Sequence, residues 1–213
     1  IVGTKLTYIN YNGIMNFVVL STSRGTTFQS VIDALQNGEL NAECLGLVSD
    51  REDRECIGKA RAANMMNLTV DTDIDPREEF DKALHEAIMD IGADDETVIA
   101  EMGWMWIHTP WFINKWKNRI INVHPALLPK HGGKGMYGHH VHDAVLEANE
   151  EESGVTFHIM DEGVDTGKIL LQKKCAVLPG DTSESLQDRV QQLEKEWYPK
   201  LLQMINNKEV SLN

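Results

Sequence analysis

Short runs of apolar residues recur along the chain, and most have the length of a buried β-strand. The first, Asn16–Leu20, is rich in valine, which favours an extended backbone. Later runs are similar, and polar or amphipathic stretches separate them. The predicted strands cover residues 16–20, 44–48, 68–70, 97–100, 119–123, 154–160 and 169–177.

The stretches between these runs predict helices. Their ends are set by residues that cap or break a helix: Gly38 follows the first, Asp75 is the expected N-cap of the third with Pro76 in its first turn, and Asp181-Thr182 begins the last. The predicted helices cover residues 28–37, about 54–63, 76–91, 139–149 and 181–205.

The alternation of strands and helices predicts an α/β fold, with a mostly parallel sheet and helices on both faces. The last two strands lie on either side of one loop, and we expect them to be antiparallel to a neighbouring strand, which makes the sheet mixed. The first strand begins just after Met15. We therefore expect residues 15–213 to form a single domain and residues 1–14 to be an N-terminal extension.

Composition narrows the function classes. The net charge of −13 argues against binding a nucleic-acid backbone, which needs a concentrated basic face. No apolar stretch reaches the roughly 20 residues that a membrane span requires. The three cysteines are widely spaced, which suggests neither a disulfide framework nor a zinc knuckle. We expect a cytoplasmic protein that acts on small molecules as a monomer or homodimer.

The strongest chemical signal is the run I-I-N-V-H-P-A-L-L-P at residues 120–129. Asn122 and His124 are two residues apart on a predicted strand, so their side chains point the same way. An amide that steadies an oxyanion, beside an imidazole that moves a proton, is suited to acyl transfer. Asp165, in the loop G-V-D-T-G, is the expected partner that orients and charges the imidazole.

A second candidate is the loop at residues 21–27, between the first strand and the first helix. The backbone N–H groups at such a helix start bind anions, and Gly25 permits close backbone approach. Thr26 and Thr27 add hydroxyl groups, and Arg24 adds a guanidinium fork for phosphate. The alternative is a capped helix without any ligand.

Histidines at 131, 139, 140 and 142 raise the question of a metal. His139 and His142 lie three apart on a predicted helix, but we expect no carboxylate or cysteine partner at ligand spacing. We therefore predict no metal. The aromatic run at residues 103–112 is expected to be core in large part and otherwise to wall a pocket for a flat heterocycle.

Taken together, these segments resemble the phosphoribosylglycinamide formyltransferase family of folate-dependent enzymes, from about Met15 to Ile205. The matching segments are N-V-H-P-A-L-L-P-K, G-K-G-M-Y-G-H-H-V-H-D-A-V, G-V-D-T-G-K-I-L-L-Q, V-L-P-G-D-T and R-V-Q-Q-L-E-K-E-W-Y-P. The resemblance implies a Rossmann-like N-terminal half and direct transfer of a formyl group. The donor would be 10-formyltetrahydrofolate, as co-substrate, and the acceptor would be the amine of glycinamide ribonucleotide.

The resemblance also implies roles for individual residues. Asn122 and a protonated His124 would contact the formyl oxygen, and Asp165 would pair with His124. The implied phosphate and ribose ligands are Arg24, Gly25, Thr26, Thr27, Arg77 and Glu194. The implied folate ligands are Met105, Trp106, Ile107, His108, Asn122, Met160, Asp161, Glu162, Gly163 and Val164.

Two departures from the family pattern stand out. The phosphate loop usually reads Ser-Gly-any-Gly-Ser-Asn, whereas this chain has Thr-Ser-Arg-Gly-Thr-Thr at residues 22–27. Trp106 stands where many members carry arginine, although the branch with the G-K-G-M-Y-G loop also has tryptophan. The family and the tight turn further suggest that the Leu128–Pro129 peptide bond is cis.

Three alternatives stay open from the sequence. A hydrolase of 10-formyltetrahydrofolate would use similar groups with water as the acceptor. A non-catalytic folate or nucleotide binder on the same fold would keep the pocket without turnover. A methionyl-tRNA formyltransferase would need a basic face, which the net charge contradicts.

Overall fold

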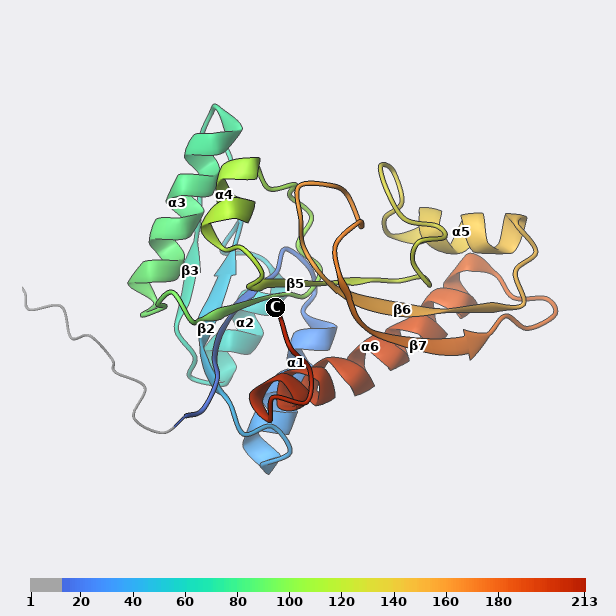
Figure 1. Cartoon of the computed structure of the whole chain (residues 1–213), viewed down its shortest axis with the longest axis horizontal. Coiled ribbons are helices and arrows are strands. Elements are labelled where there is room, and N and C mark those ends of the chain that lie inside the picture. Colours follow the sequence, from blue (N-terminus) through green and yellow to red (C-terminus); the bar gives the residue numbers. More distant parts are fainter. Residues whose placement is uncertain (1–12) are drawn as a thin grey trace, which may run out of the picture.

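A seven-stranded sheet forms the centre of the protein, in a computed structural model that describes residues 13–213 (Figure 1). Residues 1–12, which make up most of the expected N-terminal extension, lie outside the described residues. The strands are β1 Asn16–Leu20, β2 Glu43–Ser49, β3 Asn67–Thr69, β4 Val98–Glu101, β5 Ile120–His124, β6 Glu152–Ile159 and β7 Ile169–Ala176. The helices are α1 Thr26–Asn37, α2 Glu55–Ala62, α3 Arg77–Asp90, α4 Pro110–Lys115, α5 His139–Glu147 and α6 Ser183–Asn206.

The strand order is β3-β2-β1-β4-β5-β6-β7. The first five strands in this order are parallel, and β6 and β7 are antiparallel to their neighbours. The expected mixed sheet is therefore confirmed. The chain crosses from β3 at one edge to β4 in the middle. Consequently the carboxyl ends of β1 and β4 lie side by side at a topological switch point, where open α/β sheets bind ligands.

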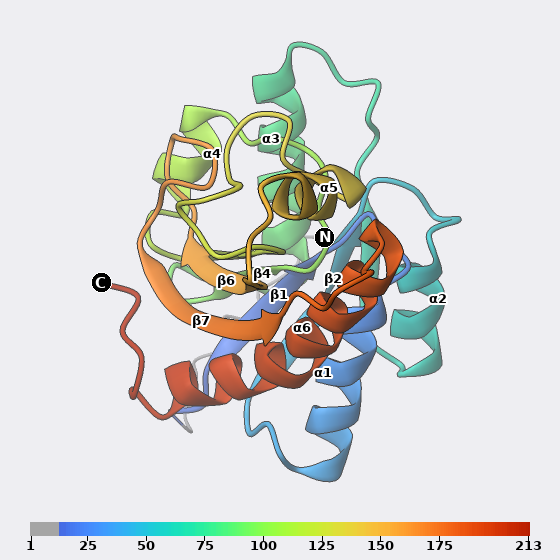
Figure 2. The same cartoon turned by 90° about the vertical axis from the view of Figure 1, so that its right-hand side faces the viewer.

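Two apolar clusters cover the two faces of the sheet. One joins the sheet to α1, α2 and α6 and includes Phe28, Leu186 and Tyr198. The other joins it to α3 and α4 and includes Phe80 and Phe112. Figures 1 and 2 show these helices on opposite sides of the strands. Burial on both faces explains why the central strands read as continuous apolar runs instead of alternating patterns.

The sequence predicted most helix boundaries closely but made two errors. It missed α4, because this helix spans only six residues, too few for an amphipathic period, and lies within the aromatic run. Asp75 is not the N-cap of α3. Pro76 takes that position with an extended backbone, and the helix begins at Arg77. Glutamates in the first turn of α3 favour the helix start by charge rather than by a side-chain cap.

The N-terminus of α6 follows its sequence signal. Thr182 is the N-cap, and its hydroxyl accepts a hydrogen bond from the backbone N–H of Ser185. The Ser185 hydroxyl in turn accepts from the backbone N–H of Thr182, which completes a capping box. Asp181 is ion-paired with Arg189, nearly two turns into the helix. The start of this long helix is thus secured independently of the rest of its length.

Candidate active site

The carboxyl end of β5 carries the central pair of the site. Asn122 and His124 lie on the same side of this strand, and His124 is its last residue. The antiparallel register places His158 of β6 directly opposite Asn122. Both histidine rings are almost completely buried. The strand pairing therefore brings two imidazoles and one carboxamide to a single region at the edge of the sheet.

The loop between β6 and β7 delivers Asp165 to His124. Its Oδ2 atom lies 3.4 Å from His124 Nδ1, and its Oδ1 atom lies 3.7 Å from His158 Nε2. The backbone N–H of Gly133 donates to Oδ2 over 2.9 Å. Asp165 itself has a left-handed backbone with φ of 59°. The contact between His124 and Asp165, 41 residues apart in the sequence, is present as expected.

The backbone carbonyl of His131 anchors the other side of the His124 ring. It lies 2.7 Å from His124 Nε2, and because a carbonyl can only accept, Nε2 carries a proton. In the neutral ring Nδ1 is then the free acceptor, and it faces Asp165. His131 holds its carbonyl in place with a left-handed backbone, φ 54°. The Leu128–Pro129 bond just before it is cis, as expected.

Burial decides the charge of His124. Burial lowers the pKa of the ring below its ordinary value, and Asp165 and the His131 carbonyl only partly oppose this. The ring is therefore neutral in the free site at neutral pH. The expectation that His124 is protonated while it stabilises the tetrahedral oxyanion stays a prediction, because burial favours the neutral ring only in the free site.

His158 is a site residue that the sequence analysis missed. Its Nδ1 atom lies 3.1 Å from the carbonyl of Ile159, so Nδ1 carries a proton and Nε2 is an acceptor. Asn122 Nδ2 lies 3.4 Å from that Nε2 atom. The carboxamide is thus oriented with its second N–H free for a ligand. Only the strand register could have revealed His158, because nothing in the sequence pairs residue 158 with residue 122.

The predicted phosphate loop lies where β1 meets α1. Gly25 is the N-cap of α1 and has φ of 67°. A Cβ atom there would lie 2.8 Å from Cys56 Cβ, so close packing with α2 also requires the glycine. Lys59 Nζ donates to the Gly25 carbonyl oxygen over 3.2 Å. Arg24 is exposed, and Thr26 begins the helix.

Thr27 joins this loop to Glu194 of α6, 167 residues later. The Thr27 hydroxyl donates to Glu194 Oε2 over 3.2 Å. Burial raises the pKa of Glu194 to about 7, and the hydrogen bond from Thr27 opposes this rise. The structure therefore brings Thr27 and Glu194, two residues of the predicted phosphate and ribose set, together, and the pKa of the Glu194 carboxyl group is near neutrality.

Arg77 lies against the loop that follows β4. Its Nε atom donates to the carbonyl oxygen of Ile107 over 3.0 Å, and its guanidinium lies over the rings of Phe80 and Trp106. Among the described residues Arg77 Nη2 has no hydrogen-bond partner, although Asp81 Oδ1 is 3.7 Å away. The structure thus places Arg77 beside Trp106 and Ile107, two residues of the predicted folate set. Its Nη2 group is available to donate a hydrogen bond to a ligand.

The ring of His108 lies within a buried ionic network. Its Nε2 atom is 2.5 Å from Glu101 Oε1, and its Nδ1 atom is 3.4 Å from Asp81 Oδ1. Asp81 Oδ2 also accepts from the backbone and the hydroxyl of Thr109. Burial lowers the pKa of His108, but the two carboxylates outweigh burial and raise it to about 9. That the backbone of His108 lines the folate pocket stays a prediction; its side chain holds the loop in place.

The loop after β6 was also predicted to contact folate. Asp161 Oδ1 accepts from the backbone N–H of Gly163 and from the hydroxyl of Thr166. Glu162 Oε1 accepts from Asn114 of α4. The side chains of Met105, Ile107 and Val164 are exposed at the surface of these loops.

The His108 network makes stability depend on pH. The folded pKa of about 9 lies above the ordinary value of 6.5, so the network stabilises the fold fully below pH 6.5. We expect this contribution, about 3 kcal/mol, to be lost as the pH rises through 9. Urea unfolding between pH 6 and pH 10 measures it. The Glu101→Leu/His108→Leu variant is the control, and an equal decline in both proteins would contradict the prediction.

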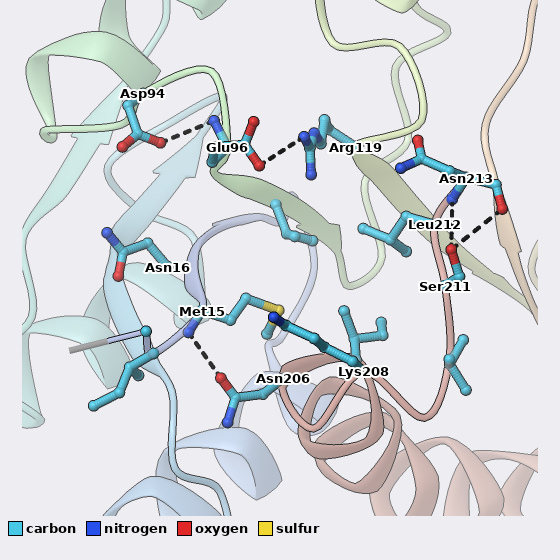
Figure 3. Close-up of a pocket in the computed structure, with 15 residues that line it drawn as sticks. Met15, Asn16, Asp94, Glu96, Arg119, Asn206, Lys208, Ser211, Leu212 and Asn213 are labelled. Atoms are coloured by element: carbon cyan, nitrogen blue, oxygen red, sulfur yellow. Dashed lines mark hydrogen bonds and ion pairs between the residues drawn. The ribbon is translucent and has the colours of Figure 1, made fainter. Parts of the chain in front are cut away.

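A pocket of about 620 Å³ lies at the opposite edge of the sheet (Figure 3). It is lined by residues near the amino ends of β1, β4 and β5 and by the C-terminal segment. Glu96 and Arg119 form an ion pair of 2.9 Å on its rim, and Asn206 accepts from the backbone N–H of Met15. The pocket is therefore separate from the Asn122–His124 site.

Within residues 13–213, none of the helices is long and apolar enough to cross a membrane.

Comparisons with known proteins agree with this geometry. Residues 15–202 match the formyl transferase family. The chain is 34% identical over 187 residues to phosphoribosylglycinamide formyltransferase of Escherichia coli, which covers 87% of this chain and 84% of that protein. It is 35% identical over 198 residues to the trifunctional purine biosynthetic protein adenosine-3 of Chironomus tentans, but spans only 14% of that relative's length.

Solved structures show the same fold. The crystal structure of glycinamide ribonucleotide transformylase 1 from Symbiobacterium toebii superposes with a TM-score of 0.84 and 29% sequence identity. The match covers 95% of this chain and 93% of that one. Phosphoribosylglycinamide formyltransferase from Coxiella burnetii gives a TM-score of 0.83 at 30% identity and covers 94% and 91%. The sheet and the site loops are therefore arranged on a shared scaffold.

Proposed function

This chain belongs to the formyl transferase family, and on that premise we propose that it transfers a formyl group from 10-formyltetrahydrofolate to the amine of glycinamide ribonucleotide. The observation that carries the proposal is the meeting of Asn122, His124 and Asp165, from two separate segments, at the carboxyl edge of the sheet. An amide donor, a buried imidazole and a carboxylate are the groups that acyl transfer to an amine needs.

The chemistry begins with attack of the neutral amine nitrogen on the formyl carbon. A C–N bond forms, and the carbonyl oxygen becomes an oxyanion that accepts a hydrogen bond from the free N–H of Asn122. The neutral ring of His124 takes the amine proton at Nδ1, through a water molecule. The proton converts the 3.4 Å contact with Asp165 into an ion pair. The proton then passes to N10 as the bond from carbon to N10 breaks.

The two substrates occupy the two halves of the switch point. The phosphate of the ribonucleotide is bound at the start of α1, by Arg24, Gly25, Thr26 and Thr27. Glu194 binds the ribose, and Arg77 contributes a positive charge near the phosphate. The folate is bound by the loops 105–108 and 160–164 and by the side chain of Asn122. The Thr27–Glu194 hydrogen bond supports the first assignment, because it couples the phosphate loop to the ribose ligand.

Both substrates are water-soluble metabolites, which fits a cytoplasmic enzyme. The proposed transfer uses no metal ion.

An absorbance assay of deformylated folate tests the function. We expect its production from 10-formyltetrahydrofolate to require glycinamide ribonucleotide and to saturate with it. Formation at the same rate without the acceptor would instead show a hydrolase. Tight folate binding without turnover of either acceptor would show a binding protein. The altered phosphate loop makes the acceptor titration the decisive part of this experiment.

A further inference from the structure

The first turn of α5 places two imidazoles and a carboxylate together on the surface. His139 and His140 begin the helix, and Asp143 lies one turn later, four and three residues away, so all three can face one point. One ligand atom of each residue lies within 4.8 Å of the other two. The two imidazole rings are 4.0 Å apart, centroid to centroid. His142 is buried and is not part of this cluster. The expectation that no carboxylate lies at ligand spacing from these histidines is wrong, because Asp143 does.

A second helix holds the carboxylate. The Ser183 hydroxyl, at the start of α6, donates a short hydrogen bond to Asp143 Oδ1. Within residues 13–213, Oδ2 of Asp143 makes no hydrogen bond and is available to a ligand. Hydrogen bonds of this kind orient the side chains that bind metal ions. The arrangement therefore has a preset oxygen ligand, which a chance cluster of surface side chains lacks.

The local charge also suits a cation. Glu184 is near enough to interact electrostatically with His139 and with Asp143, so a second carboxylate adds negative charge beside the cluster. The N-terminus of α5 carries a partial positive charge, which opposes a cation. The two carboxylates offset this opposition.

We propose that His139, His140 and Asp143 bind Zn²⁺ or a similar divalent transition-metal ion. Two imidazole nitrogens and one carboxylate oxygen are a donor set that zinc prefers, with water in the fourth position. Both histidines are exposed, so their side chains are free to close from 4.8 Å to the spacing of a tetrahedral site. A bound ion would brace the end of the glycine-rich loop 132–138 against α6 (Figure 1). None of these residues takes part in the proposed formyl transfer.

The test is metal titration of the chelator-treated full chain at neutral pH. Calorimetry with ZnCl₂ is expected to show one saturable equivalent. Co²⁺ is expected to give the intense visible absorption of a four-coordinate site. His139→Gln/His140→Gln and Asp143→Asn are each expected to weaken Zn²⁺ binding at least tenfold. Ser183→Ala is expected to weaken it several-fold, because it removes only the hydrogen bond that orients Asp143.

The matched control is His85→Gln, which removes a histidine on α3 and is expected to leave Zn²⁺ affinity unchanged. The proposal is overturned if the wild-type chain shows no saturable equivalent. It is equally overturned if the cluster variants bind like the wild type, or if the control loses as much affinity as they do. Because the readout is binding, neither result depends on formyl transfer.

Discussion

Replacing His124 with alanine is expected to lower kcat by at least about a hundredfold. The buried ring is the group placed to take the amine proton, and Asp165 stabilises the resulting imidazolium. Apart from Asn122, the binding groups proposed for both substrates lie on other segments, so KM is expected to change far less than kcat. Steady-state kinetics with glycinamide ribonucleotide and 10-formyltetrahydrofolate measure both constants.

Asn122→Ala tests the other half of the same assignment. Loss of one oxyanion donor typically lowers turnover by roughly a hundred- to a thousandfold. His85→Gln is the matched control and is expected to keep normal turnover, since the His85 ring packs against Trp111 and Trp116 and has no role in the proposed transfer. Near-normal kcat in a folded His124→Ala or Asn122→Ala variant would refute the proposed chemistry.

Replacing His108 alone with leucine is expected to lower the free energy of unfolding by about 3–5 kcal/mol. Removal of the imidazolium leaves Glu101 buried without a cation, and unpaired buried charges are costly. Asp81 is less affected, because Thr109 still donates two hydrogen bonds to it. Equilibrium unfolding in urea measures the loss.

The double variant Glu101→Leu/His108→Leu separates charge from packing. It removes both partners and fills the space with apolar side chains, so its loss is expected to be much smaller than the sum of the two single variants. Strictly additive losses would contradict the ionic network as the cause. This network also explains why a glutamate ends the otherwise apolar strand β4.

Local features of the chain determined much of the fold. Apolar runs of strand length, the glycine after α1 and the capping residues before α6 act within a few neighbouring residues, so the sequence displays them directly. The same holds for Asn122 and His124, because the two-residue repeat of a strand puts both side chains on one side. The helix α4 was missed because six residues leave a weak local signal, and the N-cap of α3 was placed one residue early because Asp75 and Pro76 both favour a helix start.

The sequence by itself thus determined most of the helices and strands, and it determined that Asn122 and His124 lie on the same side of β5. The tertiary structure alone decided which distant groups surround them: Asp165 beside His124, His158 opposite Asn122, and Glu194 with Thr27. It also decided the charge states, because burial, which no single segment reveals, leaves His124 neutral while two carboxylates charge His108. Contacts and desolvation depend on how segments pack, and packing is a property of the whole chain.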